Sequence, residues 1–138
     1  MKVITLWQPW ATWVALGWKT IETRTHNRFA CLEGKTIAIH AGKKFDDKAM
    51  LIASDYLKNK GLQAEANVVL YPKGLILCTA FVREFGFINN LAHCIDALIE
   101  CHNGGEGRYG LYLENITELK YPIKTKGSQG IWNFEIKE

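Results

Sequence analysis

The sequence predicts one small α+β domain, built on a mostly antiparallel β-barrel with two or three flanking helices. Its 138 residues suffice for a single hydrophobic core, and we assign residues 1–138 to one domain. The apolar pattern divides into five or six short strands and two or three helices. These strands do not alternate regularly with helices, which favours an antiparallel arrangement over a parallel α/β sheet.

The composition is that of an ordinary globular protein, with 48% hydrophobic and 22% charged residues. The net charge of +3 permits nucleic-acid binding without requiring it. No apolar run approaches the roughly 20 residues that span a bilayer. The first seven residues, MKVITLW, become polar too soon for a signal peptide. We therefore expect a cytoplasmic protein without a membrane partner.

The N-terminal segment predicts a strand, a short helix and a second strand. Val3–Trp7 has the composition of a core strand, and Pro9–Leu16 has helical spacing of its tryptophans. Gly17 can close this helix in the left-handed region. Lys19–Arg24 is then expected to be extended, before a loop over residues 25–34.

Alternation over Lys35–Ala41 predicts the next strand, with His40 on the face opposite its isoleucines. An apolar stripe after it predicts a helix that Asp46 or Asp47 caps and that Gly61 ends. In the C-terminal half we expect a connection over 62–73, a buried strand over Leu75–Val82 and a third helix from Asn89 or Asn90. A flexible loop is expected at Gly104–Gly107. Two closing strands, Tyr109–Leu113 and Ile131–Ile136, are expected on either side of a basic loop, Tyr121–Gly127.

The four cysteines show no paired CxxC spacing and stand in apolar stretches. Cys94 and Cys101 would share a helical face, but the neighbouring His93 and His102 would lie about 100° away round a helix. That arrangement is awkward for joint coordination. We expect structural thiols, with no metal and no cofactor.

The element from Gly17 to Arg24 gathers ionisable groups in a tryptophan-rich region. In an extended segment Glu22 and Arg24 point to one face together with Thr20, and Lys19 to the other. One interpretation is a Glu22–Arg24 ion pair beside a solvated Lys19. The other is a polar cleft with an acid, a base and an anion-binding group. A close Glu22 would raise the pKa of Lys19, which favours stabilisation of negative charge by Lys19 over general-base catalysis.

A second cationic segment follows His40, at Gly42-Lys43-Lys44. His40 is either a hydrogen-bonded strand histidine or a residue of the cleft. We expect Lys19, Arg24, Lys43 and Lys44 to converge near one end of the barrel and to give the cleft a positive potential.

Five blocks in series resemble the ASCH domain family. They are Leu6-Trp7-Gln8-Pro9-Trp10-Ala11, Gly17-x-Lys19-x-x-Glu22-x-Arg24, Ile39-His40-Ala41-Gly42-Lys43-Lys44, Gly107-Arg108-Tyr109 before Leu113-Glu114-Asn115, and Pro122-Ile123-Lys124-x-Lys126-Gly127-x-Gln129-Gly130-Ile131-Trp132. The resemblance implies a barrel of the PUA-like type and interaction with RNA or a nucleotide. With the residue pattern, it indicates a nucleic-acid or substrate site formed by Trp7, Gln8, Trp10, Lys19, Thr20, Glu22, Arg24, His40, Lys43, Lys44, Arg108 and Tyr109.

The alternative function is hydrolysis of RNA or of a modified nucleoside, with Lys19 and Glu22 as catalytic residues. Small bacterial relatives of the family remove the acetyl group of N4-acetylcytidine with a Lys, a Thr and a Glu. The motif of those relatives resembles Lys-Thr-Ile-Thr, whereas this chain has Lys19-Thr20-Ile21-Glu22. Glu22 therefore stands where the resemblance implies the nucleophilic threonine. A third alternative is an interaction module whose cleft has no ligand.

Overall fold

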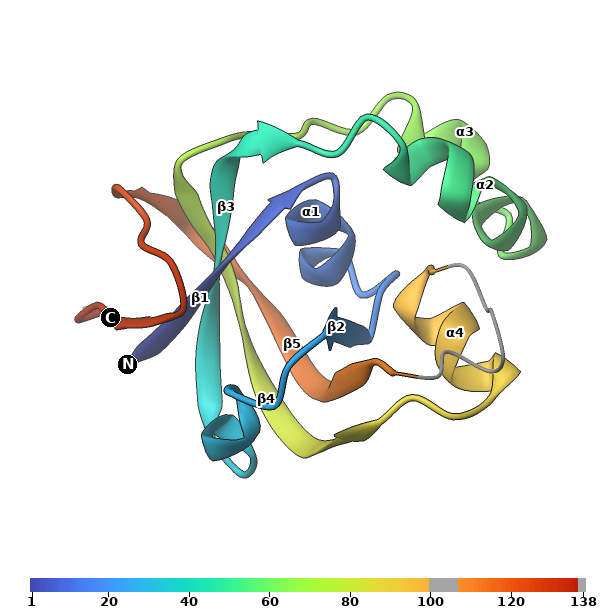
Figure 1. Cartoon of the computed structure of the whole chain (residues 1–138). Coiled ribbons are helices and arrows are strands. Elements are labelled where there is room, and N and C mark those ends of the chain that lie inside the picture. Colours follow the sequence, from blue (N-terminus) through green and yellow to red (C-terminus); the bar gives the residue numbers. More distant parts are fainter. Residues whose placement is uncertain (100–106, 137–138) are drawn as a thin grey trace.

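A six-stranded sheet with helices at one end makes up the structure, a computed structural model that describes residues 1–99 and 107–136 (Figure 1). The strands are β1 Lys2–Gln8, β2 Ile21–Arg24, β3 Thr36–Phe45, β4 Leu75–Phe87, β5 Tyr109–Lys124 and β6 Ile131–Asn133. The helices are α1 Trp10–Ala15, α2 Ala49–Asn59, α3 Gln63–Ala66 and α4 Leu91–Ala97, with a 3-10 turn η1 at Ala30–Leu32.

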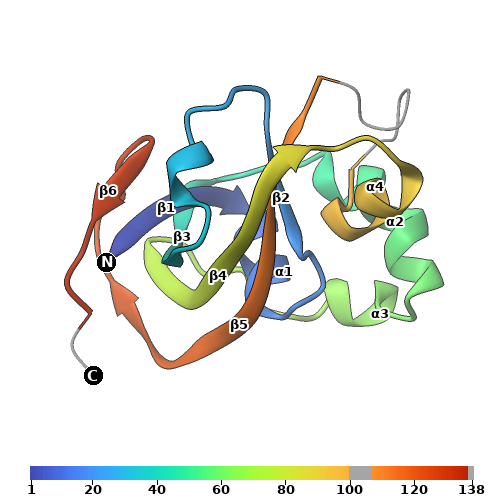
Figure 2. The ribbon, with the colours of Figure 1, turned by 90° about the horizontal axis from the view of Figure 1, so that it is seen from below.

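The strand order is β2-β5-β4-β3-β1-β6, and only β1 and β3 pair in parallel. The predicted α+β class with a mostly antiparallel sheet is therefore confirmed. Closure into a barrel is not confirmed, because β2 and β6 are the ends of the strand order and do not pair within the described ranges. The sheet instead coils strongly while staying open (Figure 2).

Strands β4 and β5 extend well beyond their predicted ends at Val82 and Leu113, and form the longest ladder of the sheet. Register shifts interrupt this ladder at three places. Each shift breaks the alternation of apolar and polar side chains, so a period of two residues cannot be followed through it. As a result, residues 121–124 of the predicted basic loop belong to β5.

Several other boundaries differ from the sequence predictions. The second strand begins at Ile21 instead of Lys19, and β6 ends at Asn133. The predicted loop 25–34 contains η1, and the predicted connection 62–73 contains α3. Most of the predicted Gly104–Gly107 loop, like Cys101 and His102, lies outside the described residues.

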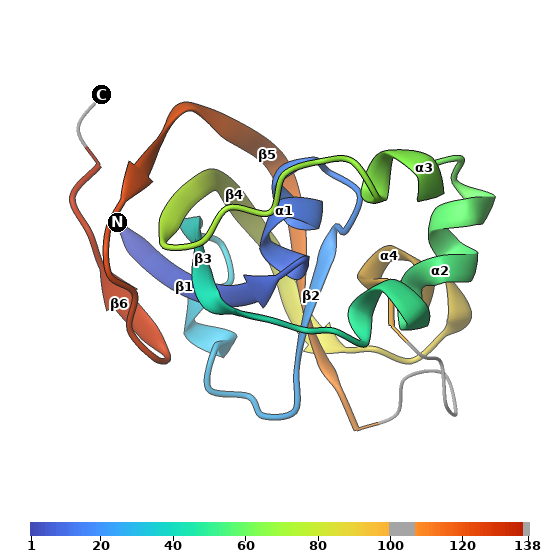
Figure 3. The same ribbon diagram turned by 90° about the horizontal axis from the view of Figure 1, so that it is seen from above.

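Helices α2, α3 and α4 gather at one end of the molecule, away from both chain termini (Figures 1 and 3). Helix α1 lies between them and the sheet, and its Ala11 and Val14 are fully buried in the sheet core. On its other side Trp13 is fully buried among residues of α2 and α3. None of the helices that the structure describes is long and apolar enough to cross a membrane. Because α1 lies between the sheet and the other helices, the segment that joins α1 to β2 runs between the sheet and helices α2, α3 and α4.

Candidate functional site

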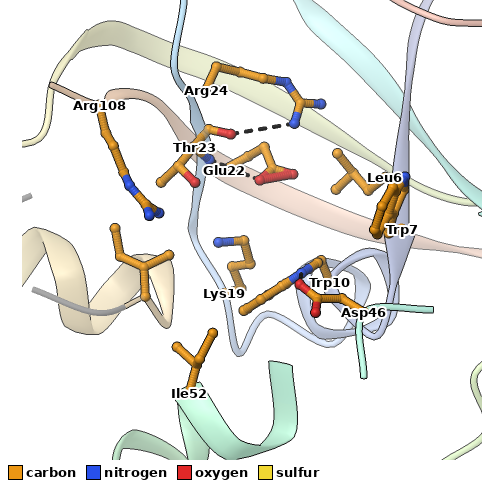
Figure 4. A pocket seen from close by; sticks show the side chains of 11 residues that line it. Leu6, Trp7, Trp10, Lys19, Glu22, Thr23, Arg24, Asp46, Ile52 and Arg108 are labelled. Atoms are coloured by element: carbon orange, nitrogen blue, oxygen red, sulfur yellow. Dashed lines mark hydrogen bonds between the residues drawn. The ribbon is translucent and has the colours of Figure 1, made fainter. Parts of the chain in front are cut away.

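A cavity of about 390 Å³ opens where β1, α1, β2 and the start of α2 meet (Figure 4). This volume is within the range of about 300–1,000 Å³ that is usual for small-molecule sites. Its walls combine aromatic, aliphatic and charged side chains. The lining residues are Leu6, Trp7, Trp10, Lys19, Glu22, Thr23, Arg24, Asp46, Ile52, Ile99 and Arg108. We call this cavity the Lys19 pocket.

The position of Lys19 follows from the end of α1. Gly17 adopts a φ of +78°, a left-handed conformation that suits glycine, and it turns the chain out of the helix. The amides of Trp18 and Lys19 then both donate to the carbonyl of Trp13, at 2.9 and 3.1 Å. The chain thus folds back along the helix end, and the Lys19 side chain enters the protein interior.

Lys19 is buried, with only 1% of its surface exposed. Its ammonium group donates a hydrogen bond to the carbonyl of Ala97 at the end of α4. The carboxyl end of a helix carries partial negative charge and favours a cation there. The ammonium also lies 4.9 Å from the centre of the Trp10 ring. These contacts fix the amine at the edge of the pocket.

Burial lowers the pKa of Lys19 from 10.5 to about 8. The Glu22 carboxylate opposes this change, whereas the guanidinium groups of Arg24 and Arg108 lower the pKa further. The predicted raising effect of Glu22 is present, but desolvation of the amine is the larger effect and lowers the pKa overall.

Glu22 and Arg24 both line the pocket, but no ion pair joins them in the part of the chain that the structure describes. The Glu22 carboxylate accepts a hydrogen bond of 2.9 Å from the amide of Thr23. The Arg24 guanidinium stacks 4.9 Å from the centre of the Phe29 ring and donates weakly to the Thr23 carbonyl. The ion-pair interpretation of these two residues is therefore wrong.

One wall of the pocket is the Trp10 ring, which Asp46 holds in place. The indole N–H of Trp10 donates to Oδ2 of Asp46 at 3.1 Å, and the Asp46 amide donates to the carbonyl of Gln8. Asp46 also accepts a hydrogen bond from the amide of Lys48. Lys48 itself is the N-cap of α2 and no side chain caps that helix, so the predicted cap by Asp46 or Asp47 is wrong.

Six of the predicted site residues lie outside the Lys19 pocket, and Gln8, Thr20 and Tyr109 are three of them. Gln8 is fully buried and its side chain is bonded to Thr12 and to the carbonyl of Pro72, which makes it a structural residue. Thr20 lines a separate cavity on the α4 side of β2. Tyr109 stacks between the rings of Phe85 and Phe87, with centres 5.5 and 4.7 Å apart.

His40, Lys43 and Lys44 line a second cavity, of about 350 Å³. His40 is 2% exposed, and its two ring nitrogens contact the Thr5 hydroxyl and the Thr125 carbonyl. It is thus a hydrogen-bonded strand histidine. The predicted cations consequently divide between two cavities, Lys19 and Arg24 in one and Lys43 and Lys44 in the other.

Sequence reasoning missed Thr23 and Asp46 as polar residues of the pocket. Strict alternation placed Thr23 on the face opposite Glu22, yet both residues line the cavity. Asp46 is 36 residues from its partner Trp10, and no local pattern connects them. Ile52 of α2 and Ile99, which follows the end of α4, are apolar residues of the lining.

The fold is that of solved ASCH structures from Zymomonas mobilis. The wild-type crystal structure aligns with a TM-score of 0.59 and 16% identity over 97% of this chain and 87% of that chain. A serine-to-alanine variant of that protein gives 0.61 and 17% over the same shares. A tyrosine-to-phenylalanine variant gives 0.56 and 19% over 89% of this chain and 74% of that chain. No family model and no curated protein sequence matches the chain.

Proposed function

We propose that this chain is an RNA- or nucleotide-binding protein of the ASCH family, with the Lys19 pocket as its ligand site. The observation that carries the proposal is the convergence of Lys19, Arg24 and Arg108 on a cavity walled by two indole rings. The five sequence blocks and the shared fold support the family assignment.

The pocket offers each kind of contact that an unpaired nucleotide requires. Trp7 is 49% exposed and can stack on a base, an interaction worth about 1–3 kcal/mol. Arg24 and Arg108 supply guanidinium groups for phosphate oxygens. Carboxylates such as that of Glu22 accept hydrogen bonds from the exocyclic amino groups of bases. A site with all three contacts favours a nucleotide over a purely apolar ligand.

Calorimetric titration with ribonucleoside monophosphates and with short single-stranded RNAs tests this function. We expect wild-type protein to bind at least one of these probes, and Lys19→Ala to weaken binding at least tenfold. Lys58→Ala, at an exposed position of α2, is the control with the same change of charge and should bind like wild type. Absence of wild-type binding to the whole panel, or equal binding by Lys19→Ala, would overturn the proposal.

A hydrolase is the second candidate, because a buried amine with a pKa of about 8 shares the pocket with Thr23 and Glu22. A lysine whose pKa approaches neutrality can accept a proton during catalysis. Cleavage of RNA or release of a free base during the same incubations, absent in Lys19→Ala, would favour this candidate. Chromatography of the incubated probes distinguishes it from simple binding.

We expect little or no release of cytidine from N4-acetylcytidine. The N4-acetylcytidine hydrolases that the sequence resembles have a nucleophilic threonine at the position of Glu22. A carboxylate has no hydroxyl group to play that part. Thr20 cannot replace it, because it lines the cavity on the α4 side of β2. Among the described residues that line the Lys19 pocket, only Thr23 carries a hydroxyl that could substitute. Robust turnover that Thr23→Val abolishes would contradict the expectation and assign that hydroxyl to catalysis.

A further inference from the structure

The second cavity is a cationic site in its own right. Lys43, Lys44 and Lys126 line it, together with the hydroxyl-bearing Ser128, and its lining contains no acidic side chain among residues 1–99 and 107–136. All three lysines are exposed, so their ammonium groups are available to a ligand. We call this cavity the lysine cavity. Its composition favours an anion with several oxygen acceptors, such as a phosphodiester.

An irregularity in the pairing of β1 and β3 creates this cluster. Between two consecutive paired positions β1 contributes only Trp7, whereas β3 contributes Gly42, Lys43 and Lys44. Such bulges redirect side chains and often occur beside binding sites. An added Cβ at Gly42 would lie 3.0 Å from the Thr5 side chain, so the chain passes close to β1 at this point. The extra residues bring the Lys44 ammonium to 5.1 Å from the centre of the Trp7 ring.

His40 holds the segment that carries Thr125 and Lys126, which forms another wall of the lysine cavity. Its Nε2 donates to the carbonyl of Thr125 at 2.8 Å, and its Nδ1 lies 3.2 Å from the Thr5 hydroxyl. That hydroxyl accepts from the indole N–H of Trp132, so its own proton is available to Nδ1. The segment that carries Lys126 is therefore fixed to β1 and β3 before any ligand arrives.

Trp7 lines both the lysine cavity and the Lys19 pocket. The two cavities are therefore neighbours that share one half-exposed indole ring. A free nucleoside can fill one of the two cavities, whereas a strand can pass the ring and reach both. The Lys19 pocket can take a base, the Trp7 ring can stack on a base and the lysine cavity can take a phosphate. Bases and phosphates alternate in the same way along a single strand.

We propose that the ligand is a single strand of at least two nucleotides that occupies both cavities. One base enters the Lys19 pocket, and a neighbouring phosphate binds Lys43, Lys44 and Lys126. The strand contacts the Trp7 ring as it passes between the two cavities. This inference rests on the proposed function and extends it from a nucleotide to an oligonucleotide.

The test compares an eight-nucleotide RNA, the DNA of the same sequence and the matching nucleoside monophosphates by calorimetry at several salt concentrations. The variant K43A/K44A/K126A removes the cations of the lysine cavity. The variant K2A/K35A/K58A has the same net charge but changes exposed lysines that line neither cavity. Circular dichroism checks that both variants fold.

We expect K43A/K44A/K126A to bind the eight-nucleotide RNA roughly ten- to a hundredfold more weakly, with a salt slope lower by about 0.7, which is the contribution of one phosphate contact on a single strand. Monophosphate binding should stay as in wild type, and K2A/K35A/K58A should resemble wild type throughout. The DNA arm decides whether the 2′-hydroxyl contributes. Retained monophosphate binding with an unchanged RNA affinity and salt slope would overturn this inference alone. No binding of any probe by wild type would overturn the proposed function as well.

Discussion

A Lys19→Met variant is expected to gain stability relative to wild type at neutral pH, and to lose that advantage as the pH rises. The folded protein holds Lys19 with a pKa of about 8, against 10.5 for the unfolded chain. Between these values the unfolded chain binds more protons, so the stability of the wild type increases with pH. Between pH 7 and pH 10 the free energy of unfolding of the wild type is expected to increase by about 2–3 kcal/mol through Lys19. Methionine has a similar length and no charge, so the variant lacks this increase.

Urea denaturation of both proteins at each pH measures this difference. Groups common to the two proteins cancel, so the change in the difference with pH reports Lys19. Loss of the hydrogen bond to Ala97 offsets part of the gain at every pH, by about 1–3 kcal/mol, but it does not alter the slope. Glu22→Gln is the informative companion, because removing the carboxylate that raises the Lys19 pKa should begin the rise at a lower pH. A difference that is constant over this range would mean that the Lys19 amine is solvated.

A Gly127→Ala substitution is expected to destabilise the fold by about 1–3 kcal/mol and to open the lysine cavity. An added Cβ would lie 2.6 Å from Cε1 of His40 and 2.8 Å from Oγ1 of Thr5. Neither neighbour can yield easily, because His40 is buried and both belong to the hydrogen-bonded set that holds Thr125. The segment with Lys126 must therefore move outward.

Thermal and urea unfolding measure the stability loss, and titration with the eight-nucleotide RNA measures the effect on the cavity. Gly86→Ala is the matched control, since its Cβ would meet only Glu84 Oε1 at an ordinary 3.8 Å. That control should remain within about 0.5 kcal/mol of wild type. Wild-type stability and RNA affinity in Gly127→Ala would show that the segment is not held against His40.

Lys19 connects stability with the proposed function. A buried, partly desolvated ammonium is costly for the fold, yet desolvation strengthens its interaction with a negatively charged ligand. Loss of ligand affinity together with a gain of stability in Lys19→Met would be the signature of a residue retained for binding. A plain structural lysine would instead show a loss of stability with unchanged binding.

The sequence by itself determined the elements whose causes are local. The short helix before Gly17, the turn after it and the placement of Lys19 just beyond follow from residues within one or two turns of each other. The α+β class and the mostly antiparallel sheet also follow, because strand and helix periodicities are properties of short segments. The five blocks that resemble ASCH proteins pointed to the same fold.

Only the tertiary structure decided the electrostatics and the assembly of the site. The pKa of Lys19 depends on how deeply the helical end buries its amine, and a sequence contains no measure of desolvation. Within the described residues no ion pair joins Glu22 and Arg24, and the Arg24 guanidinium lies over the Phe29 ring. The division of the cations between two cavities depends on the β3 bulge beside Trp7. Bulges and long-range contacts of this kind arise from pairing between distant segments, and local patterns do not record them.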